Sequence, residues 1–180
     1  MFLSLLENRR SIRHFKPESL KKNEVDILME ALLRSPTSRG RKPWEFIFVS
    51  EPEVLNKLAM AKEHGSTFLK GAPLAVVVCA DTERSDVWVE DCAIASIIVQ
   101  LTAESMGLGS CWVQIRLRSH GEGLSSEGYL RDVLGLPARY AVASIIGIGH
   151  PEERLPGHPK KSLQFDKIHL NSYRRIAVND

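Results

Sequence analysis

The stretch PLAVVVCA, Pro73–Ala80, decides the fold class of this chain. It is continuously apolar and rich in valine, a pattern typical of a β-strand that is buried on both faces. The segments on either side of it alternate between strand-like and helix-like patterns. On pattern alone, such alternation favours an α/β fold with a parallel sheet, although periodicity does not give the direction of a strand.

Hydrophobic spacing and turn residues place the remaining elements. Four apolar residues within Val25–Leu32 follow the i, i+3, i+4, i+7 spacing, which predicts an amphipathic helix over 22–34. This helix should stop before Pro36, because proline disfavours helical geometry in the residue that precedes it. The same reasoning predicts strands over 45–49, 110–115 and 140–148, and helices over 52–62, 86–106 and 127–134.

The longest predicted helix, 86–106, is apolar nearly all round and ends at Gly107 and Gly109. A helix of this kind must be covered on every side, so it is either central to the fold or part of a subunit interface. Residues 150–180 contain prolines and many charges without a long periodic run. Such a tail has no core of its own, so it lies on another surface or is disordered.

The composition is that of an ordinary single domain. A chain of 180 residues can bury a core, and its net charge of +2 is too small to favour nucleic acid. The N-terminus is not typical of a signal peptide, and no apolar run is long enough to span a bilayer. Three cysteines, an odd number, imply no disulfide framework. We therefore expect a cytoplasmic protein without nucleic-acid or membrane partners.

Several catalytic patterns are missing from the sequence. No GxxxxGK[ST] or complete GxGxxG loop cradles a phosphate, and neither GxSxG nor HExxH marks a hydrolase. The six histidines are scattered without metal-ligand spacing, so we expect no metal site. Ser–His or Cys–His dyads stay open, because spatial neighbours cannot be read from sequence. Without a marked nucleophile or metal, the chemistry is best assigned to a cofactor.

Three short basic clusters indicate what such a cofactor carries. Arg9–Arg13 holds three arginines around a serine, Arg39–Lys42 is a second cluster, and Lys160–Lys161 is a third. The planar fork of arginine can grip a phosphate through two hydrogen bonds, so convergence of the clusters would bind one compact anion. Taken alone, each cluster is more often a solvated surface.

Four motifs follow one another along the chain: RRSIRHF at 9–15, SPTSRGRKPWEF at 35–46, GLGSCWVQI at 107–115 and GIGHPEE at 147–153. Their order and spacing resemble those of the nitroreductase family of flavoproteins over nearly the whole chain. The resemblance implies an α+β fold with three α-β-α layers, in which a mostly antiparallel central sheet is flanked by helices. It also implies an intertwined homodimer with FMN at the interface. We follow it over the parallel sheet that alternation alone favours.

In the resembled family, the N-terminal basic motif binds the FMN phosphate and one edge of the flavin ring. The resemblance thus assigns cofactor contacts to Arg9, Arg10, Ser11 and Arg13. A basic site after the last strand closes on the phosphate, and the matching residues here are Lys160 and Lys161. The family often has arginine there, so these lysines would contribute charge without a bidentate grip.

The family's PSxxNxQPW segment lines the flavin from the partner subunit. Its matching cofactor contacts here are Pro36, Thr37, Ser38 and Lys42. Two departures matter, since Gly40 replaces the usual asparagine and Lys42 the usual glutamine. The amide contacts are therefore not carried over, and Lys42 either brings charge to the flavin or faces solvent.

Another family segment faces flavin N5 through backbone groups, and here it corresponds to Trp112, Val113 and Gln114. Backbone donors near the ring would stabilise its reduced form. Trp112 is equally consistent with core packing. Gly149, with Gly147, would let the chain pass close to the cofactor.

The resemblance implies an FMN-dependent NAD(P)H oxidoreductase. Hydride would pass from NADH or NADPH through flavin N5 to an electron-poor acceptor, such as a nitroaromatic or quinone, by a ping-pong mechanism. No catalytic side chain is expected, because FMN carries the hydride chemistry. Residues 1–149 would form the FMN-binding core, and residues 150–180 an extension of the same domain that wraps the partner subunit.

Three alternatives stay open. One is a related flavin enzyme that acts on a specific metabolite, such as a reductive dehalogenase or an enal reductase. Another is a protein that binds FMN for storage or sensing without turnover, and the third is a small basic RNA-binding protein. The sequence identifies neither the acceptor nor a preference between NADH and NADPH.

Overall fold

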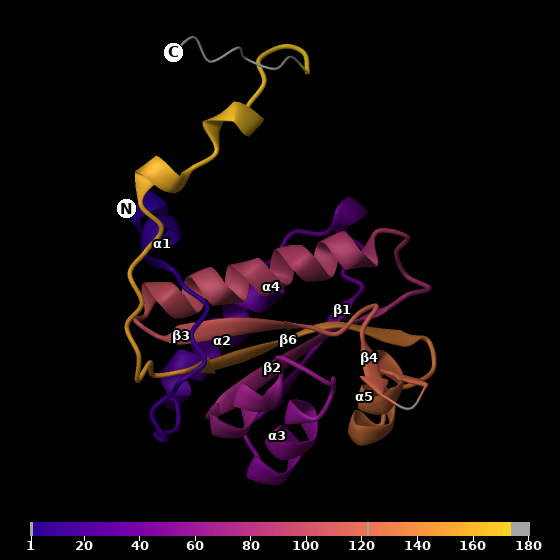
Figure 1. Cartoon of the computed structure of the whole chain (residues 1–180). Coiled ribbons are helices and arrows are strands. Elements are labelled where there is room, and N and C mark those ends of the chain that lie inside the picture. The colour runs from indigo at the N-terminus through magenta and orange to yellow at the C-terminus, as the bar shows by residue number, and fades with distance from the viewer. Residues whose placement is uncertain (1, 122, 174–180) are drawn as a thin grey trace.

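The structure, a computed structural model, describes residues 2–121 and 123–173 (Figure 1). One of the two inner strands of its main sheet is β2, Leu74–Asp81, and every residue of this strand is buried, as the apolar stretch predicts. The four-stranded sheet has the order β1-β2-β6-β3, with β1 at Trp44–Val49, β6 at Tyr140–Gly149 and β3 at Gly109–Gln114.

Every strand pair in this sheet is antiparallel. The expected α+β fold is therefore confirmed, and the parallel sheet that alternation alone favours is wrong. β2 and β3 do run in the same direction, but β6 inserts between them. The local sequence pattern predicts a strand–helix–strand unit. The insertion of β6 between the two strands depends on tertiary packing, for which the local sequence gives no signal.

Helices cover both faces of the sheet (Figure 1). α2 (Lys22–Leu33) and α4 (Trp88–Ser105) pack on one face. α3 (Pro52–Ala59) and α5 (Ser126–Leu134) pack on the other. Successive residues of β2 enter opposite cores, which explains why its sequence is continuously apolar instead of alternating.

Several element ends agree with local chemistry. α3 ends at Ala59, earlier than the predicted boundary at Lys62, and the Ser66 hydroxyl donates to the Ala59 carbonyl at 2.8 Å. α5 ends at Leu134, as predicted, and Gly135 caps it. The sequence reasoning missed the short elements, which are α1 (Phe2–Asn8), β4 (Ser119–Gly121), β5 (Leu124–Ser125) and the 3₁₀-helices η1 (Ser38–Gly40), η2 (Thr67–Gly71), η3 (Lys160–Ser162) and η4 (Phe165–Lys167).

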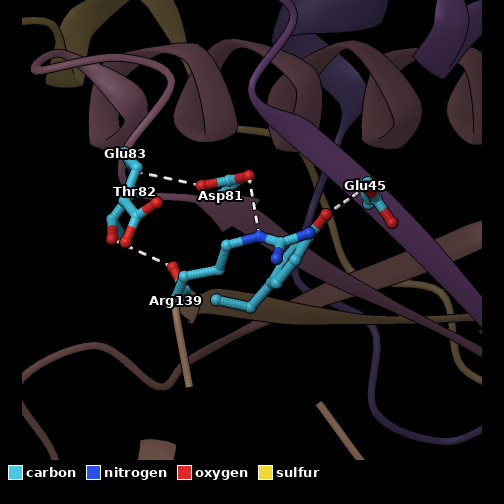
Figure 2. Close-up of polar contacts among 6 residues, drawn as sticks. Glu45, Asp81, Thr82, Glu83 and Arg139 are labelled. Carbon is cyan, nitrogen blue, oxygen red and sulfur yellow. Dashed lines mark hydrogen bonds and ion pairs between the residues drawn. The ribbon is translucent and has the colours of Figure 1, made fainter. Parts of the chain in front are cut away.

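A polar network fastens the end of β2 to the start of β6 (Figure 2). Arg139 donates from Nε to Asp81 Oδ2 at 3.0 Å, and its backbone carbonyl accepts from the Thr82 hydroxyl at 2.9 Å. The Tyr140 hydroxyl donates to Glu45 of β1, and this hydrogen bond raises the pKa of the Tyr140 phenol. The network thereby fixes the turn that leads from β2 into α4.

Beyond β6 the chain forms an arm, residues 150–173, that extends away from the sheet (Figure 1). Its later part carries exposed apolar side chains, among them Phe165 at 60% and Tyr173 at 84% exposure. The remainder of the predicted tail, 174–180, lies outside the described residues. Among the helices of the described part, none is long and apolar enough to cross a membrane.

Gly135→Ala should lower the free energy of unfolding by about 1 kcal/mol, because a Cβ disfavours the left-handed conformation that caps α5. Gly135 has a φ of 64°. A Cβ at this position would contact no neighbouring residue, so the expected loss comes from the backbone conformation alone. Urea unfolding followed by circular dichroism measures the effect. Gly71→Ala is the matched control, since Gly71 has equally open space without a positive φ, and it should be neutral or slightly stabilising. Equal losses in both variants would contradict the assigned cap.

Candidate functional site

The N-terminal basic motif lies against the ends of β3 and β6. Arg9 directly follows α1, and the chain then becomes extended. Ser11 forms a parallel bridge with Ser110 of β3, and the Ile12 amide donates to the Ser110 carbonyl at 3.0 Å. Phe15 forms a second bridge beyond the end of β6. The motif therefore continues the edge of the sheet.

Glycines make this close approach possible. A Cβ at Gly109 would lie 2.8 Å from Cγ2 of Ile12. A Cβ at Gly149 would lie 2.6 Å from Pro73 and 3.0 Å from Phe15. Protein packing alone thus requires glycine at both positions. A cofactor contact at Gly149 stays a prediction.

The outer edge of β3 presents backbone groups beside the motif. The Ser110 carbonyl accepts from Ile12, so it points away from β6. The N–H and C=O groups of successive residues point to opposite sides of a strand. Those of Trp112 and Gln114 therefore point to the same outer edge as the Ser110 carbonyl, whereas those of Val113 point toward β6. The Trp112 indole donates to Gln114 Oε1 at 3.1 Å, which holds both side chains in place.

The charges of cationic side chains from separate segments act on Cys111, a buried residue of β3. Burial raises the pKa of the Cys111 thiol, and the charges of Arg13, Lys62 and Arg9 oppose this rise. Lys62 is itself partly buried, and burial together with the charge of Arg118 lowers the pKa of its ammonium. The sequence reasoning missed Lys62 and Arg118, because both lie outside the three basic clusters.

Glu153 ties the arm to the N-terminal motif. Its Oε1 accepts from the backbone amides of Arg13 at 2.8 Å and His14 at 3.2 Å. These bonds, the Arg13 amide foremost, lower the pKa of the Glu153 carboxyl. The Arg10 guanidinium donates to the Pro156 carbonyl. Arg10 therefore contacts the arm, whereas the charges of Arg9 and Arg13 act on Cys111 of β3.

The second basic motif lies on the loop 36–42, before the start of β1. This loop carries the predicted contacts Pro36, Thr37, Ser38 and Lys42. The Ser38 amide donates to Asp91 Oδ1 at 2.9 Å, which anchors the loop to the first turn of α4. The loop is thus fixed by a contact that the sequence did not reveal.

A single chain does not bring the loop 36–42 to the N-terminal motif. The motif lies by the last turns of α4, where the positive charge of Arg9 acts on the Glu104 carboxyl. About 20 Å of helix separates Glu104 from Asp91, which holds the loop. The two predicted parts of the cofactor site therefore lie at opposite ends of α4.

The predicted phosphate lysines, Lys160 and Lys161, lie in η3 on the arm and are exposed. Just before η3 the arm passes close to α1, since a Cβ at Gly157 would clash with the Glu7 carbonyl oxygen. Neither lysine forms an ion pair within the residues that the structure describes. Their approach to a phosphate stays a prediction.

These groups fit a flat cofactor that carries a phosphate. Arg9 and Arg13 offer guanidinium donors, and the outer edge of β3 offers backbone N–H groups beside them. The indole N–H of Trp44, next to the loop 36–42, is buried without an acceptor among residues 2–121 and 123–173. Such a donor is expected where a group outside the chain completes a site. The described residues contain no cluster of His, Cys, Asp and Glu that could hold a metal ion.

Comparisons with known proteins identify relatives of this chain. The model of the nitroreductase family matches residues 6–64 and 56–150. A protein from Archaeoglobus fulgidus, named as a candidate NADH dehydrogenase or NAD(P)H nitroreductase, is 32% identical over 155 residues, 84% of this chain and 86% of that protein. The solved structure of an FMN-dependent nitroreductase from Clostridium difficile R20291 has a TM-score of 0.93 at 40% identity, covering 95% of this chain and 99% of that one. An NADPH-dependent FMN reductase from Bacillus subtilis is 26% identical over 191 residues, 92% of this chain and 72% of that protein.

This chain has an antiparallel sheet between two helical layers, with the N-terminal basic motif at the edge of the sheet, and the TM-score of 0.93 shows that the solved Clostridium difficile structure has the same fold. The matched residues include all four strands of the main sheet. The chain belongs to the nitroreductase family.

The Glu153 carboxyl should titrate below the value of about 4.3 that is usual for glutamate. Its bonds to the Arg13 and His14 amides stabilise the folded protein above that pH, and this stability is lost as the pH falls through the lowered pKa. The ¹⁵N–¹H resonances of both amides report the titration by NMR. It should disappear in Glu153→Gln. A midpoint at or above the usual glutamate value would contradict these bonds.

Proposed function

We propose that this protein is an FMN-dependent NAD(P)H oxidoreductase. The observation that carries the proposal is the position of Arg9 and Arg13 beside the outer edge of β3, which puts phosphate donors and backbone donors on one surface. Family membership supports it, as do the names of the relatives, which include an FMN-dependent nitroreductase and an FMN reductase.

The chain's own residues would bind and orient FMN. Arg9 and Arg13 would hold the phosphate, Ser11 would add a hydroxyl donor, and the outer edge of β3 at Trp112–Gln114 would face the ring. FMN, when bound, supplies hydride transfer from a reduced nicotinamide to an electron-poor acceptor. No side-chain acid or base is assigned to the reaction.

A homodimer would complete the site. α4 is apolar nearly all round, yet Ile94 and Ile97 are 38% and 39% exposed in the single chain. The loop 36–42 and the N-terminal motif lie at opposite ends of this helix. If two α4 helices pack antiparallel about a two-fold axis, the loop of one protomer meets the N-terminal motif of the other. Pro36, Thr37, Ser38 and Lys42 would then line the flavin of the partner subunit.

The arm would wrap the partner subunit as an extension of the core formed by residues 1–149. The apolar side chains of its later part are more than half exposed to solvent among residues 2–121 and 123–173, because the arm leaves the body of the protein (Figure 1). A second copy of the chain would cover them. The exposed residues concerned are Leu163, Phe165, Ile168, Leu170 and Tyr173. Docking of the arm would also carry Lys160 and Lys161 toward a phosphate.

The acceptor in this proposal is a nitroaromatic, a quinone or a similar electron-poor compound. Both substrates would use the same face of FMN in turn, which is ping-pong kinetics. All three cysteines are free and buried, which suits the reducing cytoplasm where we place the protein.

Replacing Arg9 and Arg13 together by alanine should weaken FMN binding about 100-fold or more, because each charge-assisted hydrogen bond contributes roughly 1.5–3 kcal/mol. Titration by flavin fluorescence at constant ionic strength measures the affinity. The matched control is Arg34→Ala with Lys57→Ala, which removes equal charge from α2's C-terminal end and from α3. Equal affinity in the wild type and the Arg9/Arg13 variant would contradict the phosphate assignment.

The wild-type protein provides the test of activity itself. Purified with FMN, it should be yellow, and NADH or NADPH should bleach it under anaerobic conditions. Nitroaromatics or quinones should then restore the colour. Failure of both nicotinamides to bleach it would favour FMN storage, and bleaching without reoxidation by these acceptors would favour a specific metabolite.

Deletion of residues 158–180 should convert a dimer into monomers or aggregates with loss of FMN, because it removes the apolar arm and both arm lysines. It keeps Glu153 and Pro156, which bind the N-terminal motif. Light scattering coupled to size exclusion reports the mass. A full-length FMN-bound monomer of 20.2 kDa would overturn the dimer, and a truncated protein that stays dimeric and yellow would overturn the role of the arm.

A further inference from the structure

The loop 36–42 has a backbone conformation that needs external support. Arg39, Gly40 and Lys42 have φ angles of 53°, 65° and 46°. Residues other than glycine rarely adopt this left-handed region, because Cβ approaches the following carbonyl oxygen. A local run of such residues persists only where surrounding contacts determine it, and such runs concentrate at functional sites.

Hydrogen bonds within the loop supply part of that support. The Lys42 amide donates to Thr37 Oγ1 at 3.1 Å, and the Arg41 amide donates to the Ser38 carbonyl at 3.1 Å. Arg41 also pairs with Asp86 at 3.3 Å, but this ion pair is exposed and therefore screened. None of these contacts attaches the loop to the buried part of the molecule.

Asp91 makes that attachment. Its carboxylate accepts from the Ser38 amide at 2.9 Å through Oδ1 and from the Ser85 hydroxyl at 3.5 Å through Oδ2. Asp91 is 2% exposed and Ser85 is 1% exposed. No cation pairs with Asp91 within the described residues. The first turn of α4 favours a negative charge at this position, so the carboxylate can stay buried while it holds the loop.

We propose that Asp91 is a positioning residue, whose buried carboxylate fixes the loop 36–42 in the conformation that receives the partner's flavin. This inference rests on the proposed function, because the loop has a ligand only if FMN binds between two chains. Asp91 itself would not touch FMN. It would act through the Ser38 amide, from whose N–H group it accepts a hydrogen bond.

The experiment compares substitutions of Asp91 in the full-length protein. Asp91→Asn keeps an acceptor for the Ser38 amide, so FMN affinity should stay within about threefold of the wild type. Asp91→Leu keeps the branched shape of the side chain, although it is bulkier, and removes the acceptor, so affinity should fall on the order of tenfold to a hundredfold, the range of one charge-assisted hydrogen bond. Rescue by asparagine separates alignment of the loop from a requirement for charge.

A second readout uses the FMN-free protein. Hydrogen exchange of the Ser38 amide should be slow in the wild type and in Asp91→Asn, and fast in Asp91→Leu. Ser96→Ala is the matched control on the same helix, since the Ser96 hydroxyl bonds Ser144 of β6 at 3.0 Å instead of the loop. This control should lose stability without a change in Ser38 exchange or in FMN affinity.

Should Asp91→Leu fail to fold, the bond can be removed from the loop. Ser38→Pro deletes the amide donor at an exposed position, and the extended backbone of Thr37 accepts a following proline. Ser38→Ala deletes only the hydroxyl, so weaker FMN binding by the proline variant than by the alanine variant isolates the N–H group.

Unchanged FMN affinity in Asp91→Leu, or equal affinities in Ser38→Pro and Ser38→Ala, would overturn the positioning role. A wild-type protein that binds no FMN would instead overturn the proposed function and, with it, the ligand of the loop. In that case the exchange data would show whether Asp91 holds the loop at all. The two failures are therefore distinguishable.

Discussion

Complete burial of β2 is the constraint on which the rest of the structure depends. A strand without an exposed face needs a helical layer on each side and a paired strand at each edge. β1 and β6 pair with the two sides of β2, and β3 then pairs with the free side of β6, so that β3 is an edge strand of the sheet. The outer edge of β3 is then open to the N-terminal segment and to a ligand. The position of the candidate site therefore follows from how the core is covered.

α4 links this core to both halves of the site. Cys92, Ala95 and Val99 pack into the sheet, while the first turn of the helix holds one basic loop and its last turns approach the other basic motif. A rigid helix fixes the separation between them, so neither half can move toward the other within one chain. Ile94 and Ile97, which are partly exposed midway along the helix, are consistent with the proposed contact between two α4 helices.

Much of this fold could be predicted from periodicity and glycine or proline signals, including the main helices, the strands and the end of α5 at Leu134. Strand direction could not, because the insertion of β6 between β2 and β3 depends on tertiary packing, and the family motifs supplied it instead. The contacts of Asp91 and Lys62 were also beyond sequence reasoning, since they join residues that are distant along the chain. The short elements were missed because a hairpin of a few residues carries no clear periodicity.

The burial of the cysteines has a chemical consequence. Burial raises the pKa values of Cys79 and Cys92 to about 12, so at neutral pH both thiols stay protonated and almost none of the thiolate that attacks electrophiles is present. Quinones are alkylating agents as well as electron acceptors. If quinones are acceptors, as proposed, the buried and protonated thiols of Cys79 and Cys92 would be protected from alkylation by them.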